Sequence, residues 1–188
     1  KGGCVHHDNG LLGSAAFDRA EERKIQLLKQ NGFNAVRTSH NPMSESFMSA
    51  CDRLGMLVID EAFDQWKIKK NPEDYHLYFN EWSARDIRSL VLRDRNHPSV
   101  IMWSIGNEIR ERISDNGLKI AEDLKKEILK HDNTRPVTAG VNKYWDKDRK
   151  NMLSLEKAFR HLDVAGYNYM WRFYEEDHAK YPERIMYS

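Results

Sequence analysis

Short apolar runs alternate with longer amphipathic stretches along the whole chain. The apolar runs predict about seven strands, at residues 3–5, 33–38, 56–59, 100–105, 137–139, 164–169 and 185–187. The stretches between them predict helices: one begins at Asp18 with Glu21 completing a capping box, and another begins at Ser44. Apolar stripes predict two more helices, at residues 80–95 and 116–130. Strands buried on both faces and separated by helices indicate a parallel sheet of the α/β class.

Two architectures have this alternation. A (β/α)8 barrel needs eight units and roughly 250 residues, so this chain falls one unit short. An open, doubly wound sheet would ideally carry a glycine-rich phosphate loop after its first strand, and neither GxGxxG nor GxxxxGK[ST] occurs. The sequence therefore favours an incomplete (β/α)8 TIM barrel that spans residues 1–188 as one domain. In a barrel, the long spans at 62–79 and 141–150 would line the mouth.

Composition narrows the classes of function. The 188 residues include 30 Lys and Arg against 29 Asp and Glu, and this balance lacks the basic excess of nucleic-acid-binding proteins. No apolar run of about 18 residues exists, which argues against a membrane span. Two cysteines, Cys4 and Cys51, form neither a disulfide framework nor a zinc motif. The sequence predicts no nucleic-acid or membrane partner, and it leaves the cellular compartment open.

The most informative residues follow the fourth predicted strand, where Asn107 and Glu108 come directly after an apolar run. A carboxyl group at the rim of a barrel would be partly desolvated, which favours the protonated form that can donate a proton. Asn107 beside it could hydrogen-bond a substrate hydroxyl. The alternative is that Glu108 simply begins a solvated helix.

A second polar cluster follows the second predicted strand. Arg37 lies inside the apolar run, where an unpaired guanidinium would be costly, so it needs a carboxylate or a substrate as partner. Asp60 and Glu61, at the end of the third strand, are the candidate acids. Pro42 fixes a turn that could aim His40 inward.

The remaining strand ends are less specific. His6, His7 and Asp8 suggest a metal site, but adjacent histidines on a strand point to opposite faces, and the spacing of helical zinc sites is missing. Tyr169 could donate a hydrogen bond to a carboxylate, and Trp171 offers a flat surface for a sugar ring. Ordinary core packing is the alternative for these aromatic residues, and also for Trp66, Trp103 and Trp145. No GxSxG nucleophile motif is present.

Two strand-end stretches together resemble the signature regions of glycoside hydrolase family 2. They are residues 34–42 (NAVRTSHNP) and 95–108 (RNHPSVIMWSIGNE), and the similarity extends from Gly3 to Tyr169. The family contains β-galactosidases, β-glucuronidases and β-mannosidases. The resemblance implies the family's catalytic barrel and a retaining β-glycosidase, in which two carboxyl groups about 5–5.5 Å apart flank the scissile bond.

The resemblance also implies roles for individual residues. Glu108 matches the general acid/base, and Asn107 matches the residue that contacts the sugar's 2-hydroxyl. The expected carbohydrate-binding set is Asn107, Arg37, His40, Asp60, Asn168, Tyr169 and His7. Among these, Tyr169 matches the tyrosine that hydrogen-bonds the nucleophile. Magnesium or sodium lies beside the acid/base in some β-galactosidases, but no metal ligand is matched in this chain.

The sequence departs from the family pattern at its end. The nucleophile of the family is a Glu just past the seventh strand, and the chain stops at Ser188. We therefore expect a truncated barrel that is inactive alone, from a parent β-glycosidase whose first-choice specificity is β-galactoside. An exposed barrel edge would favour a homo-oligomer. The alternatives are a non-catalytic carbohydrate-binding barrel module and an endo-acting glucanase or mannanase of the same clan.

Overall fold

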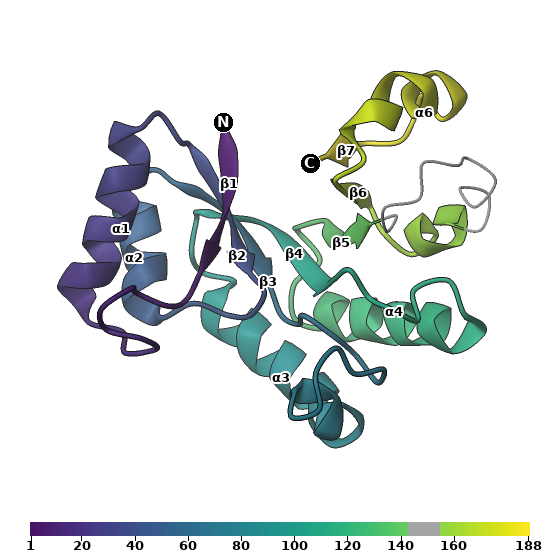
Figure 1. Cartoon of the computed structure of the whole chain (residues 1–188), viewed down its shortest axis with the longest axis horizontal. Coiled ribbons are helices and arrows are strands. Elements are labelled where there is room, and N and C mark those ends of the chain that lie inside the picture. Colours follow the sequence, from purple (N-terminus) through teal and green to yellow (C-terminus); the bar gives the residue numbers. More distant parts are fainter. Residues whose placement is uncertain (143–154) are drawn as a thin grey trace.

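The structure, a computed structural model, describes residues 1–142 and 155–188 and contains one curved parallel sheet (Figure 1). Its strands, in spatial order, are β1 (Gly2–His6), β2 (Ala35–Ser39), β3 (Leu57–Glu61), β4 (Val100–Asn107), β5 (Val137–Asn142), β6 (Val164–Asn168) and β7 (Met186–Tyr187). Every neighbouring pair is parallel, and the spatial order equals the chain order. The predicted incomplete barrel of seven strands is confirmed, with β1 and β7 as the two edges of the sheet.

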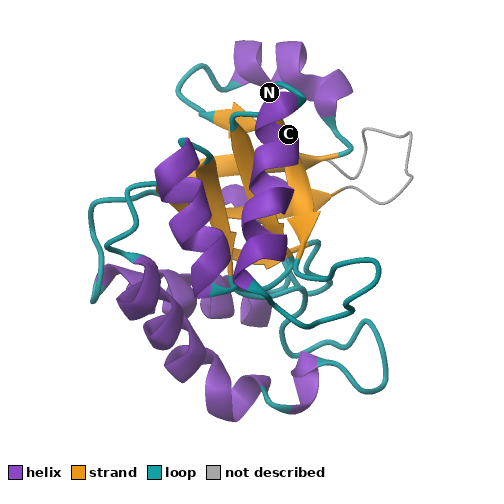
Figure 2. Ribbon diagram, turned by 90° about the vertical axis from the view of Figure 1, so that its left-hand side faces the viewer, coloured by secondary structure: helices purple, strands orange, loops and turns teal. Residues whose placement is uncertain are grey.

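Helices follow the strands and cover the outside of the sheet (Figure 2). They are α1 (Asp18–Gln30), α2 (Glu45–Leu54), η1 (Tyr75–Leu77), α3 (Phe79–Asp94), α4 (Asp115–Leu129), η3 (Glu156–Phe159), η4 (Trp171–Phe173) and α6 (Tyr174–Lys180). The predicted helix at Ser44 is confirmed, since the Ser44 hydroxyl accepts a hydrogen bond from the backbone N–H of Phe47 at 3.2 Å. None of the described helices is long and apolar enough to cross a membrane.

The capping box predicted at Asp18 is wrong. Phe17 is the residue that precedes α1, and no side chain caps this end of the helix. Glu21 is instead fully buried, and its carboxylate accepts a hydrogen bond from Asn9 Nδ2 at 3.0 Å. A tertiary contact with the loop after β1 has therefore replaced the local cap.

The main hydrophobic core lies between α1–α4 and the first five strands. The stripe predicted on α4, Leu118, Ala121, Leu124 and Ile128, is buried, and its last three residues belong to this core. Trp66 and Trp103 are also buried, as the core alternative predicted. Trp145 and most of the predicted mouth loop at 141–150 lie outside the described residues.

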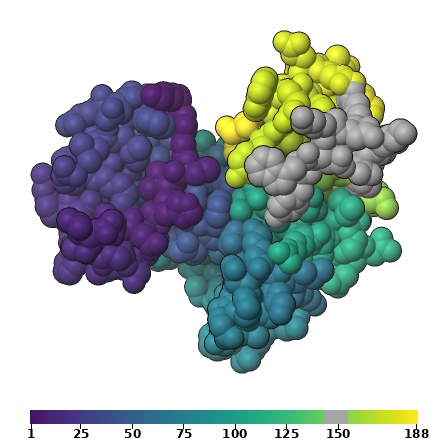
Figure 3. Space-filling model, in the orientation of Figure 1, coloured from purple at the N-terminus to yellow at the C-terminus, as the bar shows by residue number. Residues whose placement is uncertain are grey.

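The inner face of the sheet is polar, and the strand register decides which side chains reach it. Residues paired in register share a face of a sheet, and faces alternate along each strand. Arg37 is in register with Ile59, so Glu61, two residues further on, faces the same side as Arg37. Between Ser104 and Asn107 the β4–β5 register shifts, which pairs Asn107 with Gly140. In the space-filling view, a notch separates the purple N-terminal part from the yellow C-terminal part (Figure 3).

Candidate active site

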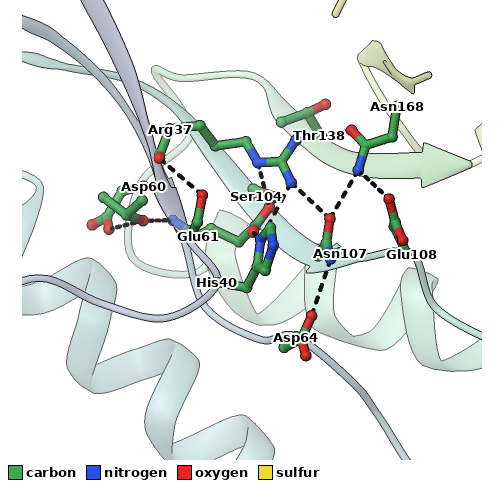
Figure 4. Close-up of polar contacts among 12 residues, drawn as sticks. Arg37, His40, Asp60, Glu61, Asp64, Ser104, Asn107, Glu108, Thr138 and Asn168 are labelled. Carbon is green, nitrogen blue, oxygen red and sulfur yellow. Dashed lines mark hydrogen bonds and ion pairs between the residues drawn. The ribbon is translucent and has the colours of Figure 1, made fainter. Parts of the chain in front are cut away.

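Arg37 is the centre of a polar network at the carboxyl ends of the strands (Figure 4). One terminal nitrogen donates to Asn168 Oδ1 at 3.0 Å, and the other donates to Asn107 Oδ1 at 2.7 Å. Its Nε lies 3.2 Å from Glu61 Oε2. Burial acts to lower the pKa of Arg37, but the charge of Glu61 raises it, so the net direction is upward and the guanidinium remains a cation. A single side chain from β2 thus joins residues from β3, β4 and β6.

Glu61 is fully buried and has a partner for each carboxylate oxygen. Ser104 Oγ donates to Oε2 at 2.6 Å, and His40 Nδ1 lies 2.6 Å from Oε1. Because a carboxylate can only accept, we infer that His40 carries a hydrogen on Nδ1. A buried carboxylate is tolerated only when it is paired and hydrogen-bonded, and Arg37, Ser104 and His40 together meet that requirement.

Glu108 is linked to this network through Asn168. Asn168 Nδ2 donates to Glu108 Oε1 at 3.0 Å and to Asn107 Oδ1 at 2.9 Å. The backbone N–H of Glu108 donates to the carbonyl oxygen of Gly140 at 2.7 Å, which fixes the residue against β5. The carboxyl group is partly exposed, so it can meet both the network and a ligand in the mouth.

Two residues at this rim have left-handed backbone conformations, which are unfavourable for residues other than glycine. The φ angle of Glu108 is +49°, and that of Tyr169 is +60°. Such strain costs about 1–3 kcal/mol per residue and is concentrated at functional sites. The charge of Glu108, together with partial burial, raises the pKa of Tyr169, so its phenol stays a neutral donor beside the carboxylate.

Gly140 provides the space that the Arg37 side chain occupies. A Cβ atom at position 140 would lie 3.0 Å from both terminal nitrogens of Arg37 and 3.1 Å from Asn107 Oδ1. These distances are shorter than ordinary contacts, so any larger residue would displace the guanidinium or the amide.

A cavity of about 590 Å³ opens beside this network. His6 and His40 line it where it meets the network, and their rings are in edge contact with centroids 5.7 Å apart. Asp64, Gln65 and Tyr75 from the span after β3 also line it, which confirms that the 62–79 span borders the site.

Comparison with known proteins agrees with this geometry. Residues 1–184 match the family model described as glycosyl hydrolases family 2, TIM barrel domain. The chain belongs to glycoside hydrolase family 2. This match argues against the alternative that the chain is an endo-acting glucanase or mannanase from another family of the clan.

The chain matches individual family 2 proteins over about a quarter of their length or less. A β-galactosidase of Bacteroides ovatus, BoGH2A, is 42% identical over 97% of this chain and 24% of its own length. A putative β-glucuronidase of Formosa agariphila is 40% identical over 79% of the chain and 14% of its length. A family 2 crystal structure from Bacteroides cellulosilyticus covers the whole chain with a TM-score of 0.92 at 54% identity. The chain spans 23% of that protein.

The structure brings together most of the residues predicted for the family 2 site. Arg37, Asn107, Glu108 and Asn168 form one hydrogen-bonded network, and His40 joins it through Glu61. The aromatic member of the predicted set, Tyr169, stands beside Glu108 with 72% of its surface exposed.

Two predicted carbohydrate-binding residues lie elsewhere. Asp60 is fully buried on the helix side of β3, where its Oδ1 accepts from the Thr38 hydroxyl at 3.4 Å. Burial, followed by the neighbouring carboxylate of Asp94, raises the pKa of Asp60 well above its ordinary value. Glu61 therefore occupies the inner position expected for Asp60. His7 turns away from the network, and its Nε2 lies 2.9 Å from the carbonyl oxygen of Ser14.

Several residues around the candidate site are not among those predicted from the sequence. Ser104 and His6 lie on the inner face of the sheet, and alternation along their strands could have indicated them. Asp64 and Lys70 come from the loop after β3, where no periodic signal exists. Among the residues that the structure describes, no group of three His, Cys, Asp or Glu side chains could hold a metal ion, so no ligands are assigned to magnesium or sodium.

Proposed function

We propose that the chain is part of the catalytic barrel of a retaining β-glycosidase, with β-galactosides as the first-choice substrates. The observation that carries the proposal is the position of Glu108, whose carboxyl group lies at the barrel mouth and accepts a hydrogen bond from Asn168 at 3.0 Å. The 42% identity to a β-galactosidase over nearly the whole chain supports the choice of sugar.

In the proposed reaction, Glu108 protonates the glycosidic oxygen as the bond to the sugar breaks. The same group then removes a proton from water, which releases the sugar from a covalent intermediate. The second carboxylate of the pair is expected from the segment after Ser188, so the 188-residue chain alone should hydrolyse little. Glu61 is unsuited to that role because it is fully buried and paired on both oxygens.

The other residues would orient the sugar. Asn107, held by Arg37 and Asn168, is expected to contact the 2-hydroxyl. Because Nδ1 of His40 is bound to Glu61, its Nε2 is left to hydrogen-bond another sugar hydroxyl. Aromatic faces at Tyr169 and Trp171, both largely exposed, are suited to the C–H face of a pyranose.

The test is a Glu108→Gln variant of the full-length protein, assayed on p-nitrophenyl β-glycosides and on an unactivated disaccharide. Loss of a general acid should lower turnover of the disaccharide by about 10²- to 10⁴-fold. A dinitrophenyl glycoside needs no protonation to leave, so its bond cleavage should be affected least, and azide should restore release of the sugar. Glu73→Gln, at an exposed position, is the matched control. Turnover of the disaccharide by Glu108→Gln that equals the control would refute the assignment.

A further inference from the structure

One lysine of the loop between β3 and η1 is directed into the site. Lys70 Nζ donates to Asp64 Oδ1 at 2.7 Å and to the backbone carbonyl oxygen of Asn107 at 2.9 Å. Its side chain is only 15% exposed. Lys67 and Lys69, in the same loop, are exposed to solvent. A lysine that gives up hydration in this way needs charge-assisted partners, and both acceptors belong to the proposed site.

Asp64 extends this contact to the Asn107 side chain. Asp64 Oδ1 also accepts from Asn107 Nδ2, at 3.0 Å. The amide oxygen of Asn107 is thereby turned toward Arg37 and Asn168, and the amide nitrogen is turned toward Asp64. Without a carboxylate at position 64, the amide nitrogen would lose its acceptor, and only the two hydrogen bonds to Oδ1 would still hold the amide.

The main-chain contact acts on Glu108. The carbonyl group that Lys70 holds belongs to the peptide bond between Asn107 and Glu108, directly before the residue with a φ of +49°. An unfavourable backbone conformation persists only when surrounding contacts fix it. The ammonium group of Lys70 holds the C=O of this peptide group and the Gly140 carbonyl holds its N–H, so the peptide is fixed from two sides.

The loop that carries Lys70 is itself fastened on both sides of the lysine. Glu111 Oε1 accepts from the backbone N–H groups of Lys67 and Ile68, at 2.8 and 3.0 Å. Asp74 Oδ2 accepts from the backbone N–H groups of Lys70 and Asn71, at 2.8 and 2.7 Å. Burial opposes ionisation of Asp74, but the backbone hydrogen bonds that it accepts lower its pKa to about 2, so this anchor is anionic at neutral pH.

We propose that Lys70 and Asp64 are positioning residues for the glycosidase reaction: together they fix the Asn107 amide and the main chain that enters Glu108. The inference rests on the proposed function, because it assigns a purpose to Asn107 and Glu108 in that reaction. Neither residue needs to touch the reacting atoms. Their effect passes through Asn107 to the 2-hydroxyl of the sugar and through the peptide bond to the acid/base group.

The test compares Lys70→Met, Lys70→Arg and the exposed control Lys69→Met in the full-length protein. The substrates are the p-nitrophenyl β-glycoside that the unmodified protein cleaves fastest and its 2-deoxy counterpart. We expect Lys70→Met to lower kcat/KM for the first substrate by about 30-fold, mainly through kcat, because the lost contacts align the transition state. The loss should be several-fold smaller on the 2-deoxy substrate, which cannot use Asn107. Lys70→Arg, which keeps the donors, should recover most of the activity.

Each outcome decides between the possibilities. Activity of Lys70→Met equal to that of Lys69→Met, or an identical loss on both substrates, would overturn the inference while leaving the proposed function intact. A folded, unmodified protein that cleaves no β-glycoside would instead refute the proposed function, and this inference with it. If Lys70→Met does not fold, Asp64→Asn provides the same substrate comparison, because it leaves the loop anchors in place.

Discussion

Replacing Arg37 by lysine tests whether the shape of the guanidinium, and not its charge alone, organises the site. A lysine can keep the ion pair with Glu61, but it cannot also reach Asn107 and Asn168, which receive hydrogen bonds of 2.7 and 3.0 Å from the two terminal nitrogens. Each bond from a charged donor contributes about 1.5–3 kcal/mol. In the variant, water that enters the mouth and the remaining Asn168–Asn107 hydrogen bond would compensate for part of this lost free energy. The net loss of stabilisation is then about 3 kcal/mol.

If that free energy is lost from the transition state, kcat/KM of Arg37→Lys should fall roughly 10²-fold. The assay is steady-state hydrolysis of a p-nitrophenyl β-glycoside by the full-length protein, with melting temperatures measured in parallel. Arg110→Lys is the matched control, because Arg110 is exposed and lies two residues from Glu108. Values for Arg37→Lys within about threefold of the control, with an unchanged melting temperature, would refute the reasoning.

Two further substitutions test the packing and the ionisation around this network. In Gly140→Ala, the new methyl group would lie 3.0 Å from the terminal nitrogens of Arg37 and 3.1 Å from Asn107 Oδ1. This crowding should lower kcat/KM about tenfold or more. Full activity would show that the guanidinium can move without consequence. Burial and the carboxylate of Asp94 raise the pKa of Asp60 in the folded protein. The folded protein therefore keeps a proton on Asp60 that the unfolded chain loses above the ordinary aspartate pKa of about 4. The free energy of unfolding consequently falls as the pH rises toward the pKa of Asp60 in the folded state. Asp60→Asn has no such proton, so its melting temperature should fall less steeply between about pH 5 and about pH 8, whereas parallel curves would contradict the raised pKa.

The sheet and the composition of the site could be predicted because both follow from where apolar runs end. The carboxyl ends of parallel strands meet at one edge, so polar residues after separate runs become neighbours. Arg37, Asn107 and Glu108 follow in this way, from two strands that are far apart in the chain. The resemblance to family 2 adds Asn168 and assigns expected roles to all four residues.

The sequence does not predict which side chains face the inside of the sheet where a shift of one residue along the strand decides it. Asp60 and Glu61 are adjacent acids at one strand end, and only the register with β2 decides that Glu61 faces Arg37. The irregularity in β4 has the same effect, because counting by twos from Ser104 would place Asn107 on the helix side. A one-residue slip exchanges the two faces of a strand, and the apolar pattern of a strand buried on both faces does not fix that slip.

The buried charges on the inner face have a physical implication for what this face does. Replacing a buried ion pair with apolar residues of similar volume is often neutral or stabilising, so the Arg37–Glu61 pair is weak evidence for stability. The pair is surrounded by polar partners and by the space at Gly140; the partners are Ser104, His40 and Asn107. These positions therefore lack the apolar packing found elsewhere in the sheet. A network that is costly to bury, and that is satisfied at nearly every atom, holds its amides and carboxylates in place before a substrate arrives. Such preorganisation is what stabilisation of a charged transition state requires.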